Sequence, residues 1–183
     1  LHIKLTPGFS FAHAEGFVEG GKYQNYDPNT GFRLGADFEF SLPFHRKKWA
    51  LLLEPTFQSY SSKGQSNEEL TVKYTSLELA MGVRHYFFVG KNANIFINGA
   101  AVLDLPTEYL SSYQESSYRM ETTSFCAAVG LGATFKRFSV EARYYTTRTT
   151  DGRADISTPS ETIFIPMNNE YQKVSIIFGY RLL

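Results

Sequence analysis

The sequence has little of what most membrane-spanning or disulfide-bonded proteins contain. Its uncharged apolar runs are only a few residues long, whereas a transmembrane helix needs about 20 consecutive apolar residues. Its single cysteine, Cys126, excludes an internal disulfide. The formal net charge of +0 gives no reason to expect a nucleic-acid partner. No signal peptide is recognisable, so we expect either a mature chain or a fragment of a longer one.

What the sequence does contain is aromatic residues, 16 Phe and 12 Tyr beside a single Trp, together with 14 Gly. Aromatic residues combined with many Ser, Thr and Asn suit β-strands and barrels better than helices. The length of 183 residues suits one domain, which we expect to span residues 1–183.

Residues 173–182 alternate between two kinds of side chain. One face carries Val174, Ile176, Phe178, Tyr180 and Leu182. The other face carries Lys173, Ser175, Gly179 and Arg181, with Ile177 as its one apolar member. A period of two residues indicates a β-strand with one apolar and one polar face. An aromatic-rich apolar face opposite a charged face is typical of a transmembrane β-barrel, with lipid outside and a polar lumen inside.

Seven further segments alternate in the same way, each near the length that a tilted strand needs to cross a bilayer. With the final one, they span residues 2–12, 32–42, 49–60, 74–87, 94–105, 124–135, 138–147 and 173–182. The short connections are 44–48, 89–92 and 136–137, and the long ones are 14–31, 61–73, 106–123 and 148–171. The pattern predicts an all-β fold, an eight-stranded antiparallel up-and-down transmembrane barrel with both termini on the short-turn side. Outer-membrane barrels place such turns in the periplasm and the long loops outside the cell.

Charged residues of both signs fall on the inward face in equal number. The six cations are Lys4, Arg33, Arg84, Arg143, Lys173 and Arg181. The six acids are Asp37, Glu39, Glu54, Glu78, Asp104 and Glu141. The outward positions carry none, and an Arg or Lys placed there would cost about 2–4 kcal/mol at the bilayer midplane. Because buried charges are costly unless paired, we expect an ion-pair network that fills the lumen of a narrow barrel.

The short turns are basic and contain no acid. They carry Arg46, Lys47, Lys48, Lys91, Lys136 and Arg137. A basic ring of this kind can meet anionic phospholipid headgroups or a partner. The aromatic residues beside the turns and the C-terminus fit a membrane-interface girdle; they are Phe44, Trp49, Phe87, Phe88, Phe135, Phe138 and Tyr180.

Two features resemble known outer-membrane proteins. The ending Gly179-Tyr180-Arg181-Leu182 resembles the terminal-strand signal of bacterial outer-membrane barrels. The stretches 31–44, 48–57 and 76–87, which include Gly82-Val83-Arg84-His85-Tyr86-Phe87, resemble a family of small outer-membrane barrels common in Bacteroidota, as does Arg143-Tyr144-Tyr145-Thr146. The resemblance covers nearly the whole chain and implies an outer-membrane location with no established activity. Because similar proteins can carry a soluble N-terminal domain, it leaves open that this chain is the C-terminal part of a longer precursor.

We expect no catalytic, cofactor-binding or metal-binding site. Barrels that resemble lipid A-modifying enzymes use a histidine with a serine and an acid near the outer rim, where His13 lies with Ser10 and Glu15 close in sequence. A nucleophile needs its base within hydrogen-bond reach, but Ser10 and His13 fall on opposite faces of their strand. The acids of residues 151–161 lack the spacing of a calcium-binding loop. A narrow lumen crowded by charged side chains argues against a channel.

The candidate partner contacts are an apolar run in the fourth long loop and small residues on the outward face. The run is Ile163, Phe164, Ile165, Pro166 and Met167. It is either an exposed contact surface or a strand extension that packs on the third loop, where Tyr109, Tyr113 and Tyr118 recur. The small residues, Gly99 with Ala101 and Ala127 with Ala133, would let another membrane protein approach closely.

These features favour a non-enzymatic barrel of a bacterial outer membrane, acting as an accessory or docking subunit of a larger outer-membrane protein complex. We expect membrane lipid and lipopolysaccharide around the barrel and other outer-membrane proteins as partners, with no nucleic acid and no cofactor. The alternatives are a free-standing structural or adhesion barrel and, behind it, a lipid-modifying enzyme or a small channel.

Overall fold

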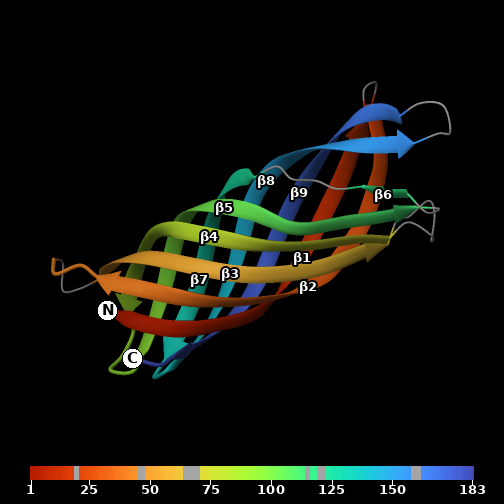
Figure 1. Ribbon diagram of the computed structural model, residues 1–183. Helices are drawn as coiled ribbons and strands as arrows, with labels where there is room; N and C mark the ends of the chain where they lie inside the picture. The colour runs from red at the N-terminus through yellow and green to blue at the C-terminus, as the bar shows by residue number, and fades with distance from the viewer. Residues whose placement is uncertain (19–20, 45–47, 64–70, 114–115, 119–122, 158–161) are drawn as a thin grey trace.

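The structure is a computed structural model that describes residues 1–18, 21–44, 48–63, 71–113, 116–118, 123–157 and 162–183 (Figure 1). Its strands are β1 (His2–Val18), β2 (Gly21–Ser41), β3 (Trp49–Lys63), β4 (Thr71–Phe88), β5 (Ala93–Tyr113), β6 (Ser116–Tyr118), β7 (Ser124–Phe135), β8 (Phe138–Ser157) and β9 (Thr162–Arg181). In the described part of the chain, no helix is long and apolar enough to span a bilayer.

The strands close into a single antiparallel barrel. Each long strand pairs with its neighbours in chain order, and β1 pairs with β9 to complete the circle. The three-residue strand β6 pairs only with the far end of β5, so eight strands form the wall. Both termini lie at the end of the barrel that carries the short turns (Figure 1). The predicted eight-stranded up-and-down barrel is therefore confirmed.

The predicted long loops are wrong in extent, because most of their residues continue the strands. In the stretch 14–31, for example, β1 runs on to Val18 and β2 begins at Gly21, and these two residues pair with each other. Polar residues dominate this stretch, so the two-residue alternation fades although backbone pairing continues. The alternation reports one apolar and one polar face, and a stretch of mostly polar residues gives no such contrast even where it is a strand.

The apolar run 163–167 is likewise strand rather than loop. Its backbone belongs to β9, where Ile163 pairs with Ile156 of β8 and Met167 pairs with Val18 of β1. The strand-extension interpretation therefore holds for the backbone. The side chains of Ile163, Phe164, Ile165, Pro166 and Met167, and any packing on the third loop, lie outside the described residues.

Within the central part of the barrel, side chains alternate between lumen and exterior. Along β7, buried and exposed residues alternate almost without interruption from Ser124 to Phe135. The exposed set is large and apolar around the whole wall, for example Phe9, Leu51 and Val140. Apolar side chains in the lumen are few; one cluster joins Ala80, Val102, Cys126, Ala128 and Tyr145. The barrel thus has an apolar exterior and a polar core, the reverse of a soluble domain.

Candidate functional site

At the end nearest the termini, the lumen charges gather around Arg84 of β4. Its Nη1 lies 2.8 Å from Asp37 Oδ2 and 2.7 Å from Glu39 Oε2, and its Nη2 lies 3.3 Å from Glu141 Oε2. Lys4 Nζ donates to the Glu39 carboxylate at 2.7 Å. All of these side chains are buried. One guanidinium thereby joins strands β2, β4 and β8 across the lumen.

In the middle layer, the Glu54 carboxylate of β3 lies between two guanidinium groups. Arg33 Nη2 donates to Glu54 Oε1 at 2.5 Å, and Arg143 Nη1 lies 2.7 Å from Glu54 Oε2. Arg143 Nε also donates to Glu141 at 2.5 Å, which links this layer to the one below. Arg33 Nη1 donates to the Tyr145 hydroxyl at 2.8 Å.

The layer nearest the long hairpins is organised around Glu78 of β4. Lys173 Nζ lies 2.5 Å from Glu78 Oε1, and Arg148 Nη1 lies 2.8 Å from the same oxygen. Arg148 also lies 3.1 Å from Asp104 Oδ2, and the Tyr74 hydroxyl donates to that carboxylate. Every acid expected in the lumen therefore has a cation within 4 Å.

The structure buries all of the predicted lumen charges except Arg181. Arg181 is the last residue of β9 and is partly exposed, and its side chain forms no ion pair within the described residues. Its register partner on β1 is Lys4, a second cation that already contacts Glu39. The prediction that Arg181 joins the network is therefore wrong, because no acid lies opposite it.

Arg148 takes the place of Arg181, although the sequence pattern assigned it to a loop. Counting in twos from Arg143 and Tyr145 would turn Thr147 inward and Arg148 outward. The β8–β9 register shifts between Tyr145 and Arg148, and a bulge of this kind adds one residue to one strand. Arg148 is consequently buried while Thr147 is exposed. With this exchange, six buried cations still face six buried acids among the described residues.

In the described part of the chain, buried and paired side chains fill the central lumen and can brace the barrel. Burying a charge is tolerated only with good geometry and additional hydrogen bonds. Every lumen acid has a cation within 4 Å, although buried atoms such as Arg84 Nε and Asp37 Oδ1 have no hydrogen-bond partner among the described residues. The Arg84 guanidinium also lies 4.5 Å from the centroid of the Phe96 ring, and Lys173 Nζ lies 4.0 Å from that of Tyr145. These contacts connect the strands of the wall across the lumen.

The residues weighed for catalysis and metal binding are placed as follows. Ser10 is buried in the lumen, with its Oγ 2.7 Å from that of Ser175, while His13 is partly exposed. The side chain of Glu15 lies outside the described residues. No group of three or more His, Cys, Asp or Glu that could hold a metal ion occurs in the described ranges.

On the outside of the barrel, one sector differs from the rest. We call it the β7 wall; it consists of the outward residues Gly99, Ala101, Phe125, Ala127, Val129, Leu131 and Ala142. Ala101 pairs with Ala127, Gly99 pairs with Val129, and Ala142 pairs with Leu131. Small residues thus stand beside the large side chains of β7, which protrude. Phe125 is 68% exposed and Leu131 62%, compared with 45% for Leu51 and 43% for Phe57 on β3.

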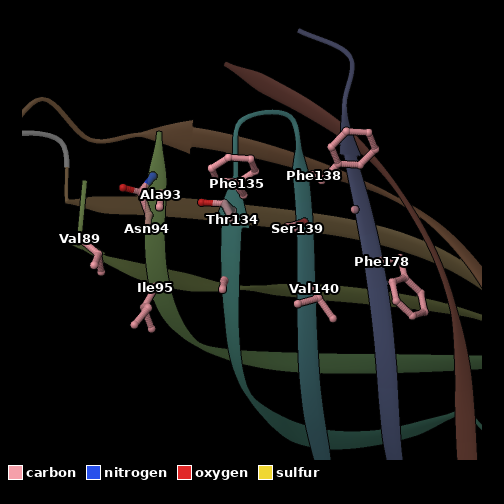
Figure 2. Close-up of a pocket in the computed structure, with 12 residues that line it drawn as sticks. Val89, Ala93, Asn94, Ile95, Thr134, Phe135, Phe138, Ser139, Val140 and Phe178 are labelled. Atoms are coloured by element: carbon pink, nitrogen blue, oxygen red, sulfur yellow. The ribbon is translucent and has the colours of Figure 1, made fainter. Parts of the chain in front are cut away.

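Below the β7 wall, at the short-turn end, the exterior is hollowed into a groove of about 500 Å³. We call it the turn groove. Figure 2 shows the side chains of Phe135, Phe138, Ile95, Val140 and Phe178 standing around it. It is completed by Val89, Ala93, Asn94, Ala133, Thr134, Ser139 and Gly179. The sequence pattern located the small residues and the aromatic girdle but gave no sign of this groove, because its walls come from four different strands.

Comparison with known proteins bears on the fold. No protein-family model and no curated protein sequence matches this chain. The outer membrane protein OprG from Pseudomonas aeruginosa has a similar structure, with a TM-score of 0.59 at 16% identity over 99% of this chain and 95% of that one. The outer membrane protein AlkL, solved in DMPC lipid bilayers, gives a TM-score of 0.57 at 12% identity over 99% of this chain and 90% of that one. The chain therefore has the fold of small outer-membrane β-barrels.

Proposed function

We propose that this chain is a non-catalytic barrel of a bacterial outer membrane, of the kind common in Bacteroidota, that docks to another membrane protein through the β7 wall. The membrane placement is supported by an apolar exterior around a charged, fully paired lumen. Such a molecule suits a bilayer, because in aqueous solution its apolar exterior would be exposed to water. We place the barrel across the outer membrane with its termini and short turns in the periplasm and its long hairpins outside the cell.

The docking proposal depends on the surface shape of the β7 wall, where small side chains lie beside protruding ones. In lipid there is no hydrophobic drive to associate, so contact depends on close van der Waals packing, which small residues permit. The small side chains of Ala101, Ala127 and Ala142 leave the surface flat, and the larger side chains of Phe125 and Leu131 protrude beside them. Because β7 carries no charge along its length, the partner should present an uncharged, apolar lipid-facing wall of its own.

Photo-crosslinking in the native bacterium tests the docking. A photoreactive residue at Leu131 should give a discrete high-mass adduct, because this position faces the proposed partner. The matched control is Phe57 on β3, which also faces lipid and should give no protein adduct. Replacing Ala127 with Trp should abolish the Leu131 adduct. A barrel that forms no adduct from Leu131, and that runs as a monomer by native mass spectrometry of membrane extracts, contradicts the proposal.

The orientation is tested separately with a membrane-impermeant maleimide. Thr123 lies at the long-hairpin end and Lys91 in a short turn, and both are exposed. Thr123→Cys should be labelled in intact cells, whereas Lys91→Cys should be labelled only after the outer membrane is opened. The native Cys126 is buried and serves as the background. Labelling in the reverse order would overturn the orientation and leave the docking proposal standing.

A further inference from the structure

The turn groove is an apolar hollow with small residues at its centre and large ones at its margin. Ala133 of β7 pairs with Ile95 of β5 on one side and with Val140 of β8 on the other. Toward the turn, the next outward residue of β7 is Phe135, which pairs with Phe138. A methyl group surrounded by branched and aromatic side chains leaves the hollow seen in Figure 2. An apolar hollow that opens toward lipid is suited to hydrocarbon.

The margin of the groove is positively charged. Lys136 and Arg137 form the β7–β8 turn, and Lys91 lies in the neighbouring β4–β5 turn; all three are exposed. The two turns are joined directly, since the Lys136 N–H donates to the Asn92 carbonyl at 2.9 Å. Lys136 Nζ lies 5.4 Å from the centroid of the Phe135 ring, which stands at the groove. These three cationic residues therefore belong to the turns that border the apolar hollow.

The positive charge is not compensated locally. The segments 88–94 and 135–140 contain no Asp or Glu, and the nearest acid in sequence, Glu141, is buried in the lumen against Arg143 and Arg84. Arg181 adds to the field at this end, because its N–H donates to the Arg137 carbonyl at 2.8 Å and its side chain forms no ion pair in the described part of the chain. The groove margin is thus complementary to an anion.

We propose that the turn groove binds an anionic phospholipid. One acyl chain lies against Ala133 between Ile95 and Val140, and the phosphate lies at the level of Lys136 and Lys91. The apolar turn groove fits the acyl chain of a phospholipid, and the cations at its margin fit the phosphate. Aromatic residues such as Phe135 and Phe138 mark the depth of the membrane interface, where headgroups lie. The inference shares the membrane placement of the proposed function but does not depend on docking to a protein.

Native mass spectrometry of the purified barrel tests the headgroup. The detergent-solubilised protein is offered dioleoyl-phosphatidylglycerol or dioleoyl-phosphatidylcholine, which share acyl chains and differ in net charge. We expect a retained phosphatidylglycerol adduct that weakens about fivefold for each cation removed in Lys136→Gln and Lys91→Gln, since a basic residue near anionic lipid contributes roughly that factor. Lys48→Gln, in the turn before β3, removes the same charge away from the groove and should leave the adduct unchanged. Equal retention of both lipids, or an adduct indifferent to Lys136 and Lys91, overturns the proposal.

A second pair of variants tests the groove itself. Ala133→Phe fills the hollow and should eliminate the phosphatidylglycerol adduct, whereas Ala36→Phe, on β2 outside both the turn groove and the β7 wall, should retain it. Far-UV circular dichroism establishes that both variants fold. An adduct that survives Ala133→Phe would show binding to surface charge alone and would overturn the acyl-chain site. The photo-crosslinking from Leu131 is read independently, so failure of lipid binding and failure of docking are distinguishable.

Discussion

At the scale of the residue, the decisive side chains are the buried ions. Glu54 is held between Arg33 and Arg143, and Glu78 between Lys173 and Arg148. Glu54 and Glu78 lie on different strands from their cations, so these four pairs connect separate strands of the wall. Removing one member of a buried pair leaves the other charge uncompensated, which typically costs about 3–5 kcal/mol. The buried ion pairs therefore contribute more to the stability of the barrel than exposed ion pairs would.

Two arginines make a matched prediction at this scale. Arg148→Gln should lower the free energy of unfolding by about 3–5 kcal/mol, because Glu78 loses one of its two cations and Asp104 loses its own. Arg181→Gln should change it by no more than about 0.5 kcal/mol, as for a residue without such partners. Urea unfolding of the barrel in lipid vesicles, followed by fluorescence of Trp49, measures both. An equal decrease in the free energy of unfolding for the two variants would show that Arg181 does belong to the ion-pair network.

At the scale of the element, the strands are longer than the membrane requires. Only their central parts show the alternation that lipid imposes, while the outer parts continue the backbone pairing. The β8–β9 bulge at Tyr145–Arg148 lies where the alternating part of β8 ends. It turns Arg148 inward at the level of Glu78 and completes the uppermost ion layer.

Hydrogen–deuterium exchange distinguishes strand from loop in these outer parts. The amides of residues 14–18 should exchange slowly, because they pair with residues 21–26 and 167–171, and ladder hydrogen bonds must open before exchange. Lys91 and Asn92, in a short turn outside any strand, provide the fast reference. If residues 14–18 exchange as rapidly as that turn, the hairpin formed by the ends of β1 and β2 is not present.

At the scale of the whole molecule, the barrel is closed at its wall and filled at its centre. An eight-stranded barrel leaves an interior just wide enough for side chains, and here Arg33, Arg84, Arg143, Tyr74 and Tyr145 are all almost completely buried within it. The surfaces left for interaction are the exterior wall and the two ends. The β7 wall and the turn groove are therefore the surfaces through which we expect the barrel to bind other molecules.

A filled lumen predicts the absence of ion conduction. The purified barrel inserted into planar bilayers should give no conductance steps at neutral pH, because buried, ion-paired side chains occupy the lumen in the described part of the chain. A sixteen-stranded porin inserted under the same conditions provides the positive control, since barrels of that size leave an aqueous channel. Regular conductance steps from the barrel alone would show that the ion pairs part to form a pore.

The sequence by itself determined the eight alternating segments, the closed barrel and the face of each strand that carries the charges. These properties are local, because parity within a strand decides which side chain meets lipid and which meets the lumen. Hence Lys4, Glu54 and Lys173 could be assigned to the interior from their own strands alone. The excess of cations at the short turns was equally visible, since it requires only counting.

Only the tertiary structure decided which charge meets which, how far the strands extend and where the exterior is hollowed. Glu54 and Arg143 are 2.7 Å apart although they come from β3 and β8, and no local pattern links them. The bulge that turns Arg148 inward interrupts the two-residue alternation from which inward-facing side chains are predicted. The turn groove arises where β5, β7, β8 and β9 bring Ala133 between larger neighbours. Pairing and shape depend on strand register around a closed circle, a property of the assembled wall and not of any one segment.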